Sequence, residues 1–198
     1  MGSRSVRSTA TAFAARVAEL LEMAGMPDLL AAIAPLIRVR ESMRIERKAQ
    51  DRTLAAQSRR DEVTRRFMTV PGVGPITSLA FKATIDDFGR FDISKAVGAH
   101  LGLTPRVYQS GEVDRSGQIS KCGDPMMRHF LYEAASALLT RTRKWSRLRA
   151  WGIAVAKRRG MKRATVAVAR KLAVILHRMW VMGTKFEFGC PPAATNAA

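Results

Sequence analysis

Cysteine is scarce in this sequence, with Cys122 and Cys190 the only two among 198 residues. Two isolated thiols exclude a disulfide framework and a zinc-binding cysteine set, so we expect a reduced, cytoplasmic setting. No run approaches the ~20 apolar residues of a membrane-spanning helix, and the N-terminus lacks the apolar stretch of a secretory signal. We therefore expect no membrane partner.

Acidic residues are also few. Asp and Glu total 16 against 34 Lys and Arg, which gives a net charge of +18. A compact domain with this excess repels itself unless a polyanion neutralises it, and nucleic acid is the commonest such partner. The alternative is a solvated basic surface with no partner. Aromatic residues make up 7% of the chain, and we expect most of them in the core.

The carboxylates are too scattered to predict a metal site. Two-metal phosphoryl transfer needs several carboxylates that converge, whereas neighbours such as Asp86 and Asp87 point apart on a helix. We predict that these two end a helix and that the chain holds no metal or cofactor of its own. The histidines are widely spaced: His100, His129 and His177. We expect each to pack or to face phosphate rather than to bind a metal.

Residue patterns divide the chain into four segments. We expect 1–10 and 190–198 to be disordered, 11–60 to be a helical linker, and 61–189 to be a compact domain. Within the linker, Asp28 is expected to cap a helix, and a thin apolar seam recurs near every seventh position on a charged background. Its members are Leu36, Val39, Met43, Gln50 and Leu54. Such a seam is typical of a coiled coil, although an amphipathic helix packed on its own domain is equally compatible.

The domain is predicted to be mainly α. Asp124 and Pro125 are suited to begin a long helix, and the last helix is expected from about Thr165 to Met182. The first of these helices has an apolar face formed by Met127, Phe130, Leu131, Ala134, Ala135, Leu138 and Leu139. Between helices, residues 102–123 are rich in Gly and Ser with short β-prone pieces, which predicts an ordered loop or small hairpin.

The sequence Pro71-Gly-Val-Gly-Pro75 separates two apolar helical segments. Gly72, Val73 and Gly74 would form a tight turn whose backbone N–H groups can approach an anion, next to the positive end of a helix. This is the form of a helix-hairpin-helix, which binds nucleic-acid phosphates without reading bases. An ordinary turn between helices is the alternative.

Ser110 lies in a polar loop, Tyr108-Gln-Ser-Gly111, surrounded by basic residues. The side chains predicted to bind phosphate there are Arg106, Arg115, Lys121 and Arg128. A serine hydroxyl becomes a nucleophile only when a base takes its proton, and no histidine nearby is clearly placed to do so. From the residues alone, a Ser-Gly pair is more often a simple turn.

Three stretches together resemble a known family: TVPGVGPITSLAFKATIDDFGRF, VGAHLGLTPRVYQSGEVDRSGQISKCGD and LYEAASALL. In this order and spacing, over about Asp61 to Gly189, they resemble the C-terminal domain of insertion-sequence family one-hundred-and-ten, the bridge-RNA-guided transposases. The preceding segment resembles that family's coiled-coil linker.

The resemblance implies a function. In that family a RuvC-like N-terminal domain with metal-binding carboxylates works with the C-terminal domain, whose serine, Ser110 here, attacks a DNA phosphodiester to give a phosphoserine intermediate. A structured guide RNA chooses the sites by base pairing, and subunits assemble into oligomers. This sequence begins within the linker, so we expect a fragment without the RuvC-like domain, with Mg²⁺ needed only alongside that domain. Such a fragment would be inactive alone and would bind DNA, guide RNA and further transposase subunits. The alternatives are an inert nucleic-acid-binding module and a dominant inhibitor of the full-length transposase.

Overall fold

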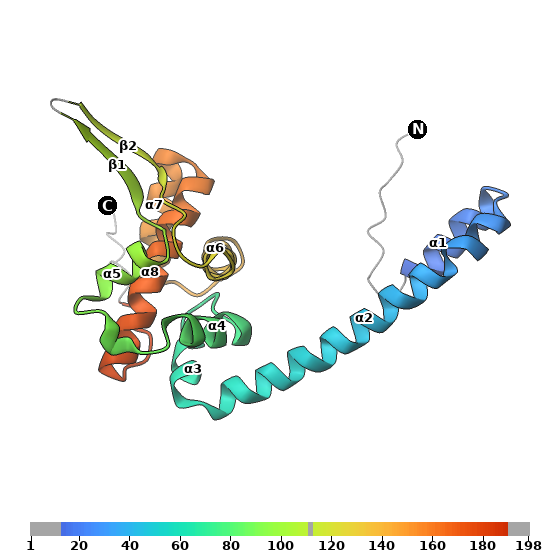
Figure 1. Ribbon diagram of the computed structural model, residues 1–198, viewed down its shortest axis with the longest axis horizontal. Coiled ribbons are helices and arrows are strands. Elements are labelled where there is room, and N and C mark those ends of the chain that lie inside the picture. The colour runs from blue at the N-terminus through green and yellow to red at the C-terminus, as the bar shows by residue number, and fades with distance from the viewer. Residues whose placement is uncertain (1–12, 111–112, 190–198) are drawn as a thin grey trace, which may run out of the picture. The chain divides into compact units, whose positions relative to one another are not determined.

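The computed structural model describes residues 13–189 except 111 and 112, and it is mainly α (Figure 1). The described helices are α1 (Phe13–Met23), α2 (Pro27–Arg60), α3 (Glu62–Phe67), α4 (Pro75–Ile85), the 3-10 turn η1 (Phe88–Arg90), α5 (Ser94–His100), α6 (Pro125–Thr140), α7 (Arg147–Arg159) and α8 (Met161–Met182). Strands β1 (Pro105–Ser110) and β2 (Val113–Ile119) form one antiparallel hairpin. The predicted fold class is thus confirmed. The segments expected to be disordered, 1–10 and 190–198, lie outside the described residues.

The chain forms two compact units, Met1–Arg52 and Thr53–Ala198. In the first, Phe13 and Val17 of α1 and Ile33 of α2 line a shallow apolar hollow, and the Arg40 guanidinium lies 4.1 Å from the centre of the Phe13 ring. Helix α2 begins at Pro27, so Asp28 lies in the first turn rather than at the cap. At this position its negative charge still interacts favourably with the positive N-terminal end of the helix. Whether α2 pairs in a coiled coil stays a prediction.

The core of the second unit is built around α6 and α8, which pack against each other. The predicted apolar face of α6 is buried, apart from the partly buried Phe130. Opposite it, α8 buries alternating large and small side chains such as Val168, Ala169 and Leu172, which allow close helix packing. Helix α8 begins at Met161 rather than Thr165, because Gly160 alone, with φ of +82°, separates it from α7.

Two predicted helix boundaries are confirmed. The Asp124 carboxylate accepts the Met126 N–H at 2.7 Å, and Pro125 follows in the first turn of α6. Asp86 ends α4, and Asp87 begins η1 by accepting the Gly89 N–H at 2.8 Å. At the two helix starts, the Asp124 and Asp87 side chains accept backbone N–H groups that the helix leaves unpaired.

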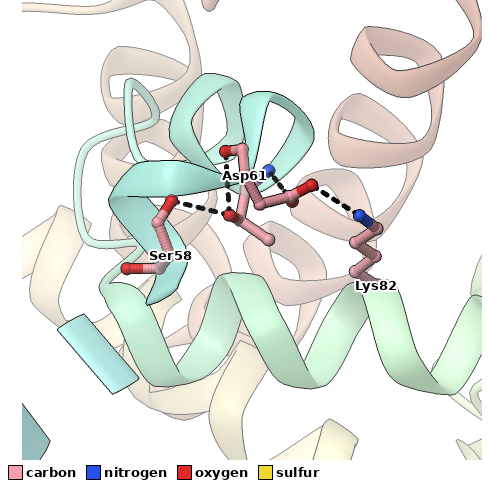
Figure 2. Close-up of polar contacts among 4 residues, drawn as sticks. Ser58, Asp61 and Lys82 are labelled. Atoms are coloured by element: carbon pink, nitrogen blue, oxygen red, sulfur yellow. Dashed lines mark hydrogen bonds and ion pairs between the residues drawn. The ribbon is translucent and has the colours of Figure 1, made fainter. Parts of the chain in front are cut away.

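A polar cluster fixes the joint between α2, α3 and α4 (Figure 2). The Asp61 carboxylate accepts the Thr64 N–H at 2.9 Å and pairs with Lys82 Nζ at 2.7 Å, while the Thr64 hydroxyl donates to Ser58 O at 2.7 Å. Burial opposes the charge on Asp61, but the hydrogen bonds from Lys82 and Thr64 outweigh it and lower the pKa of this carboxyl. The end of α2 is thereby held against α3 and α4.

The segment 184–189 lies outside the helices and strands, yet it is anchored to the rest of its unit. Phe186 N–H donates to Thr69 Oγ1 at 2.9 Å, and Phe188 O accepts the Arg147 N–H at 2.9 Å. The Phe186 and Phe188 rings meet edge to face, with centroids 5.0 Å apart. These contacts leave no periodic pattern in the sequence, because they involve two aromatic rings and individual backbone hydrogen bonds.

Candidate nucleic-acid interface

The turn between α3 and α4 is packed against α6. Gly72 has φ of +90°, and a Cβ at this position would lie 2.3 Å from Ala134 O and 3.0 Å from Leu138 N. Val73 is buried, and its N–H donates to Val70 O at 3.0 Å. The closest packing in the motif therefore involves Gly72 and Val73, which contact the protein's own core.

Gly74 has the opposite setting. It is the N-cap of α4, and a Cβ there would meet nothing within 4 Å. No side chain caps α4, its first turn has no acidic residue, and Ile76 beside the turn is 40% exposed. Of the three predicted turn residues, Gly74 alone combines open space with a helix N-terminus that favours an anion.

The hairpin places Ser110 at the end of β1, where its backbone pairs with Val113 of β2. Tyr108 pairs with Arg115, so Ser110 and Arg115 occupy ladder positions of the same parity. Positions of one parity belong to one face of a two-stranded ladder. Figure 1 shows that this hairpin extends beyond the helices of its unit. The register brings the predicted nucleophile and one predicted phosphate ligand to the same outer part of the hairpin.

Arg128 occupies the base of the hairpin and binds the protein backbone. Its Nη1 donates to three carbonyl oxygens, those of Leu101 at 3.3 Å, Cys122 at 2.6 Å and Gly123 at 3.0 Å. The two loops that it joins are so close that a Cβ at Gly123 would lie 2.2 Å from His100 O. Arg128, predicted to bind phosphate, thus positions the loops that carry the hairpin.

Arg106 and Lys121 lie on the outer side of the hairpin base. Arg106 Nη2 donates to Ser120 O at 3.2 Å, and the exposed Lys121, with φ of +58°, is held by its N–H to Gly102 O at 3.1 Å. Together with Gln118 and Ile119 they line a hollow of about 320 Å³. Both cations remain accessible to an anion.

The turn between α7 and α8 adds three more cations to this region. Arg159, Lys162 and Arg163 line a hollow of about 500 Å³ whose other wall is the hairpin base, including Gln118 and Ile119. We call Arg106, Lys121, Arg159, Lys162 and Arg163 the hairpin-base surface. Among the described residues lining its two hollows, none is acidic. The site prediction did not include these three cations, because their proximity to the hairpin is a tertiary contact.

The predicted residues do not form a single site. Ser110 and Arg115 lie close together in the strand register, and Arg106 and Lys121 line the same hollow at the hairpin base. Gly74 belongs to a separate turn. Among the described residues, no group of three or more His, Cys, Asp or Glu is placed to hold a metal ion. His177 packs in the core, with Nδ1 3.0 Å from Ser94 Oγ and Nε2 3.0 Å from Phe88 O.

Residues 64–150 match the sequence profile described as the transposase IS116/IS110/IS902 family. Over this span the chain is similar to that family. The match includes the α3–α4 turn, the whole hairpin and α6, so the family predicted from the sequence is confirmed. We call residues 64–150 the transposase domain.

Curated relatives extend the similarity of the transposase domain. The chain is 37% identical over 135 residues to the transposase for insertion sequence element IS1111A of Coxiella burnetii, covering 68% of this chain and 36% of the relative. It is 32% identical over 142 residues to the putative transposase y4pF/y4sB of Sinorhizobium fredii, covering 71% and 37%. It is 33% identical over 128 residues to the transposase for insertion sequence element IS1328 of Yersinia enterocolitica, covering 64% and 38%. The chain thus spans little more than a third of the length of these relatives. Separately, no helix within the described residues is long and apolar enough to cross a membrane.

Proposed function

We propose that this chain is a transposase module that binds DNA through its hairpin-base surface and supplies Ser110 as the nucleophile of strand cleavage and rejoining. One observation supports the proposal most directly. In the transposase domain, strand β1 of the hairpin ends at Ser110, and five cations lie around the base of the same hairpin. A structured guide RNA, with the same backbone chemistry, would bind the same surface.

Electrostatics support binding to a phosphate backbone. The chain carries a net charge of +18, and none of the ion pairs among the described residues involves the hairpin-base surface. Unpaired cations release condensed counterions when they meet phosphates, so the affinity should fall steeply with salt. If the five cations each neutralised one phosphate, the slope of log affinity on log salt would be about −4 to −5.

The proposed reaction is a reversible exchange of phosphodiester bonds. Ser110 Oγ forms a bond to a DNA phosphorus while the bond from that phosphorus to one deoxyribose oxygen breaks. The serine proton passes to a base, and the departing oxygen gains a proton and leaves as a hydroxyl end. Rejoining is the reverse, with a hydroxyl end of another strand attacking the phosphoserine, so the number of phosphoester bonds is conserved.

We expect the base and any metal for that step to come from outside this chain. The described residues lack a carboxylate or histidine cluster that could hold a metal ion, so they do not fit a resident Mg²⁺, and we derive no step through one. We therefore propose that a carboxylate-rich domain on another part or subunit of the transposase activates Ser110, and that the chain assembles with it.

Ser110→Ala tests this proposal. The chain is combined with the carboxylate domain of a related transposase and with element-end DNA. We expect the substitution to reduce strand joining at least ~1000-fold and to abolish a serine–DNA adduct detected by mass spectrometry, because the nucleophile is lost. DNA affinity should be unchanged. Ser116→Ala, in the partner strand of the same hairpin, is the matched control and should retain joining. Joining that survives Ser110→Ala would remove the catalytic role.

The same assay separates two other functions. A purely DNA-binding module would bind DNA but give no joining or adduct with any added domain. A dominant inhibitor would lower joining by an intact transposase when the chain is added in excess. Cleavage by the purified chain alone would contradict our expectation that it is inactive without a partner domain.

A further inference from the structure

A groove on the helical body, outside the hairpin-base surface, joins an apolar floor to a basic rim. It has a volume of about 690 Å³ and is formed by α5, α7, α8 and the 184–189 segment. Its floor includes Trp151, Val174, Ile175 and Phe186. Neither the Ser110 chemistry nor the hairpin-base surface uses this groove.

The rim of the groove is almost entirely cationic. Five basic side chains line it, namely Lys95, Arg147, Arg170, Lys171 and Arg178, against the single acid Glu187. None of the ion pairs among the described residues involves any of these five. A ligand that complements the groove must therefore offer negative charge around an apolar group.

The aromatic floor and the cations are in direct contact. Lys171 Nζ lies 3.7 Å from the centre of the Trp151 ring, close enough for a cation–π contact. Trp151 and Phe186 are both only partly buried, and both pack against the core. An anion bound by Lys171 would thus lie beside an aromatic ring that retains exposed surface.

We infer that this groove binds a single-stranded segment of nucleic acid, with one unpaired base on the apolar floor and the neighbouring phosphates on the cationic rim. The inference rests on the proposed nucleic-acid function and names a second contact for it. A basic groove that contains aromatic side chains is the usual form of a sequence-tolerant single-strand site. In a duplex the base faces are stacked inside, so only an unpaired base could use the floor.

Helix α8 connects the groove with the hairpin-base surface. Arg163 belongs to that surface and Arg170 to the groove rim. They are seven residues apart, so they lie on the same side of α8 and about 10 Å apart along its axis. A polyanion bound at the hairpin base can therefore continue into the groove, which favours nucleic acid over an acidic peptide as the occupant.

The test compares three probes at one salt concentration: a short labelled oligothymidylate, a DNA duplex of the same length, and a labelled peptide of Glu and Leu. We expect Trp151→Leu to weaken oligothymidylate binding roughly 5- to 150-fold, the range for loss of one stacked base, and to leave duplex affinity unchanged. Trp151→Phe keeps a ring and should restore most of the affinity. The melting temperature of each variant checks that it is folded.

A charge variant supplies a second measurement that does not alter the floor. Lys95→Glu with Lys171→Glu should weaken oligothymidylate binding more than Lys48→Glu with Arg52→Glu. The control pair changes the net charge equally but does not line the groove. Ultraviolet crosslinking of the bound oligothymidylate should map to the peptides of α7 and α8.

The outcomes separate this inference from the proposed function. If the chain binds the duplex but Trp151→Leu leaves oligothymidylate binding intact, the groove assignment fails and the DNA-binding proposal stands. If neither nucleic acid binds, both fail. If the acidic peptide binds in a Trp151-dependent manner and the oligothymidylate does not, the groove is a protein-docking site and the inference is overturned.

Discussion

The two compact units of this chain differ most in what they bury. Every buried apolar side chain among the described residues belongs to Thr53–Ala198, and no described side chain of 13–52 is buried. In the first unit, seam residues such as Leu36 and Met43 are about two-thirds exposed, at 69% and 68%. The second unit thus has its own core, whereas the first has apolar surface that another molecule could cover.

The units also differ in how their charges are used. In the first unit, cations pair with nearby acids on the same helix, as Arg44 does with Glu41 and Arg16 with Glu19. In the second, the hairpin-base surface and the groove rim have no such partners among the described residues. The charge of the first unit is partly neutralised locally, while the cations of the hairpin-base surface and the groove rim remain available to a polyanion.

The largest expected effect is on the packed turn of the second unit. Gly72→Val would place a Cβ 2.3 Å from Ala134 O at a φ of +90°, so we expect it to lower the free energy of unfolding by at least ~3 kcal/mol. Urea unfolding followed by circular dichroism measures this. Gly74→Ala is the matched control two residues away. Its Cβ meets nothing, and it should cost less than about 1 kcal/mol.

A second substitution tests the polar contact inside the core. Phe88 O can only accept, so Nε2 of His177 carries the hydrogen that it donates, and Nδ1 accepts from the Ser94 hydroxyl. His177→Leu leaves both partners unpaired, and we expect it to cost about 2–4 kcal/mol of unfolding free energy. The exposed His129 provides the comparison, since His129→Leu should change stability by less than about 0.5 kcal/mol. Equal effects at the two positions would contradict the structural role of His177.

Local sequence patterns predicted much of the second unit. Helix α6 followed from its capping Asp124, from Pro125 and from apolar residues at helical spacing, because these signals act within a few turns of chain. The short β-prone pieces within 102–123 allowed either an ordered loop or a small hairpin, and the structure has the hairpin, with strands Pro105–Ser110 and Val113–Ile119. Short-range capping and periodicity are encoded in neighbouring residues, so a single sequence carries them.

Tertiary contacts explain what the sequence did not predict. Arg128 was expected to bind phosphate, but its acceptors Leu101 and Gly123 come from two different loops. Arg163 and Arg170 meet the hairpin base and the groove only because α8 packs where it does. From the sequence, the charge of these residues predicts only that they are exposed to solvent. Their partners depend on which segments the fold brings together.

A smaller effect is expected at the joint where α2 enters the second unit. Asp61→Ala removes the cap of α3 and the ion pair with Lys82, so we expect a loss of about 1–2 kcal/mol at neutral pH. The pKa of Asp61 is lower in the folded protein than in the unfolded chain, so the folded state binds fewer protons. Its contribution is therefore present above the unfolded pKa, near 4, and is lost as the pH falls through the folded pKa.

Urea unfolding at neutral and acidic pH measures that change. The difference between the wild-type protein and Asp61→Asn should shrink as the pH falls below about 4, because the wild-type carboxyl then becomes neutral too. Glu62→Gln removes a neighbouring carboxylate whose side chain is 63% exposed in its pair with Arg66, so it should have little effect at either pH. A difference for Asp61→Asn that is independent of pH would show that the cap, and not the charge, stabilises the joint.

The smallest effect on unfolding is expected in the seam of the first unit, and it tests the comparison most directly. Met43→Lys removes an apolar side chain that is 68% exposed, so it should change the unfolding of Thr53–Ala198 by less than about 0.5 kcal/mol. If the seam is covered by a second helix, as a coiled coil requires, the same substitution should weaken self-association measured by sedimentation. Ile45→Lys, which adds the same charge at a 57% exposed position of α2 outside the seam, controls for the change in charge. Loss of self-association without loss of stability would assign the two units separate tasks, with assembly in the first and folding and nucleic-acid binding in the second. A large loss of stability would instead show that the seam belongs to the core of its own chain.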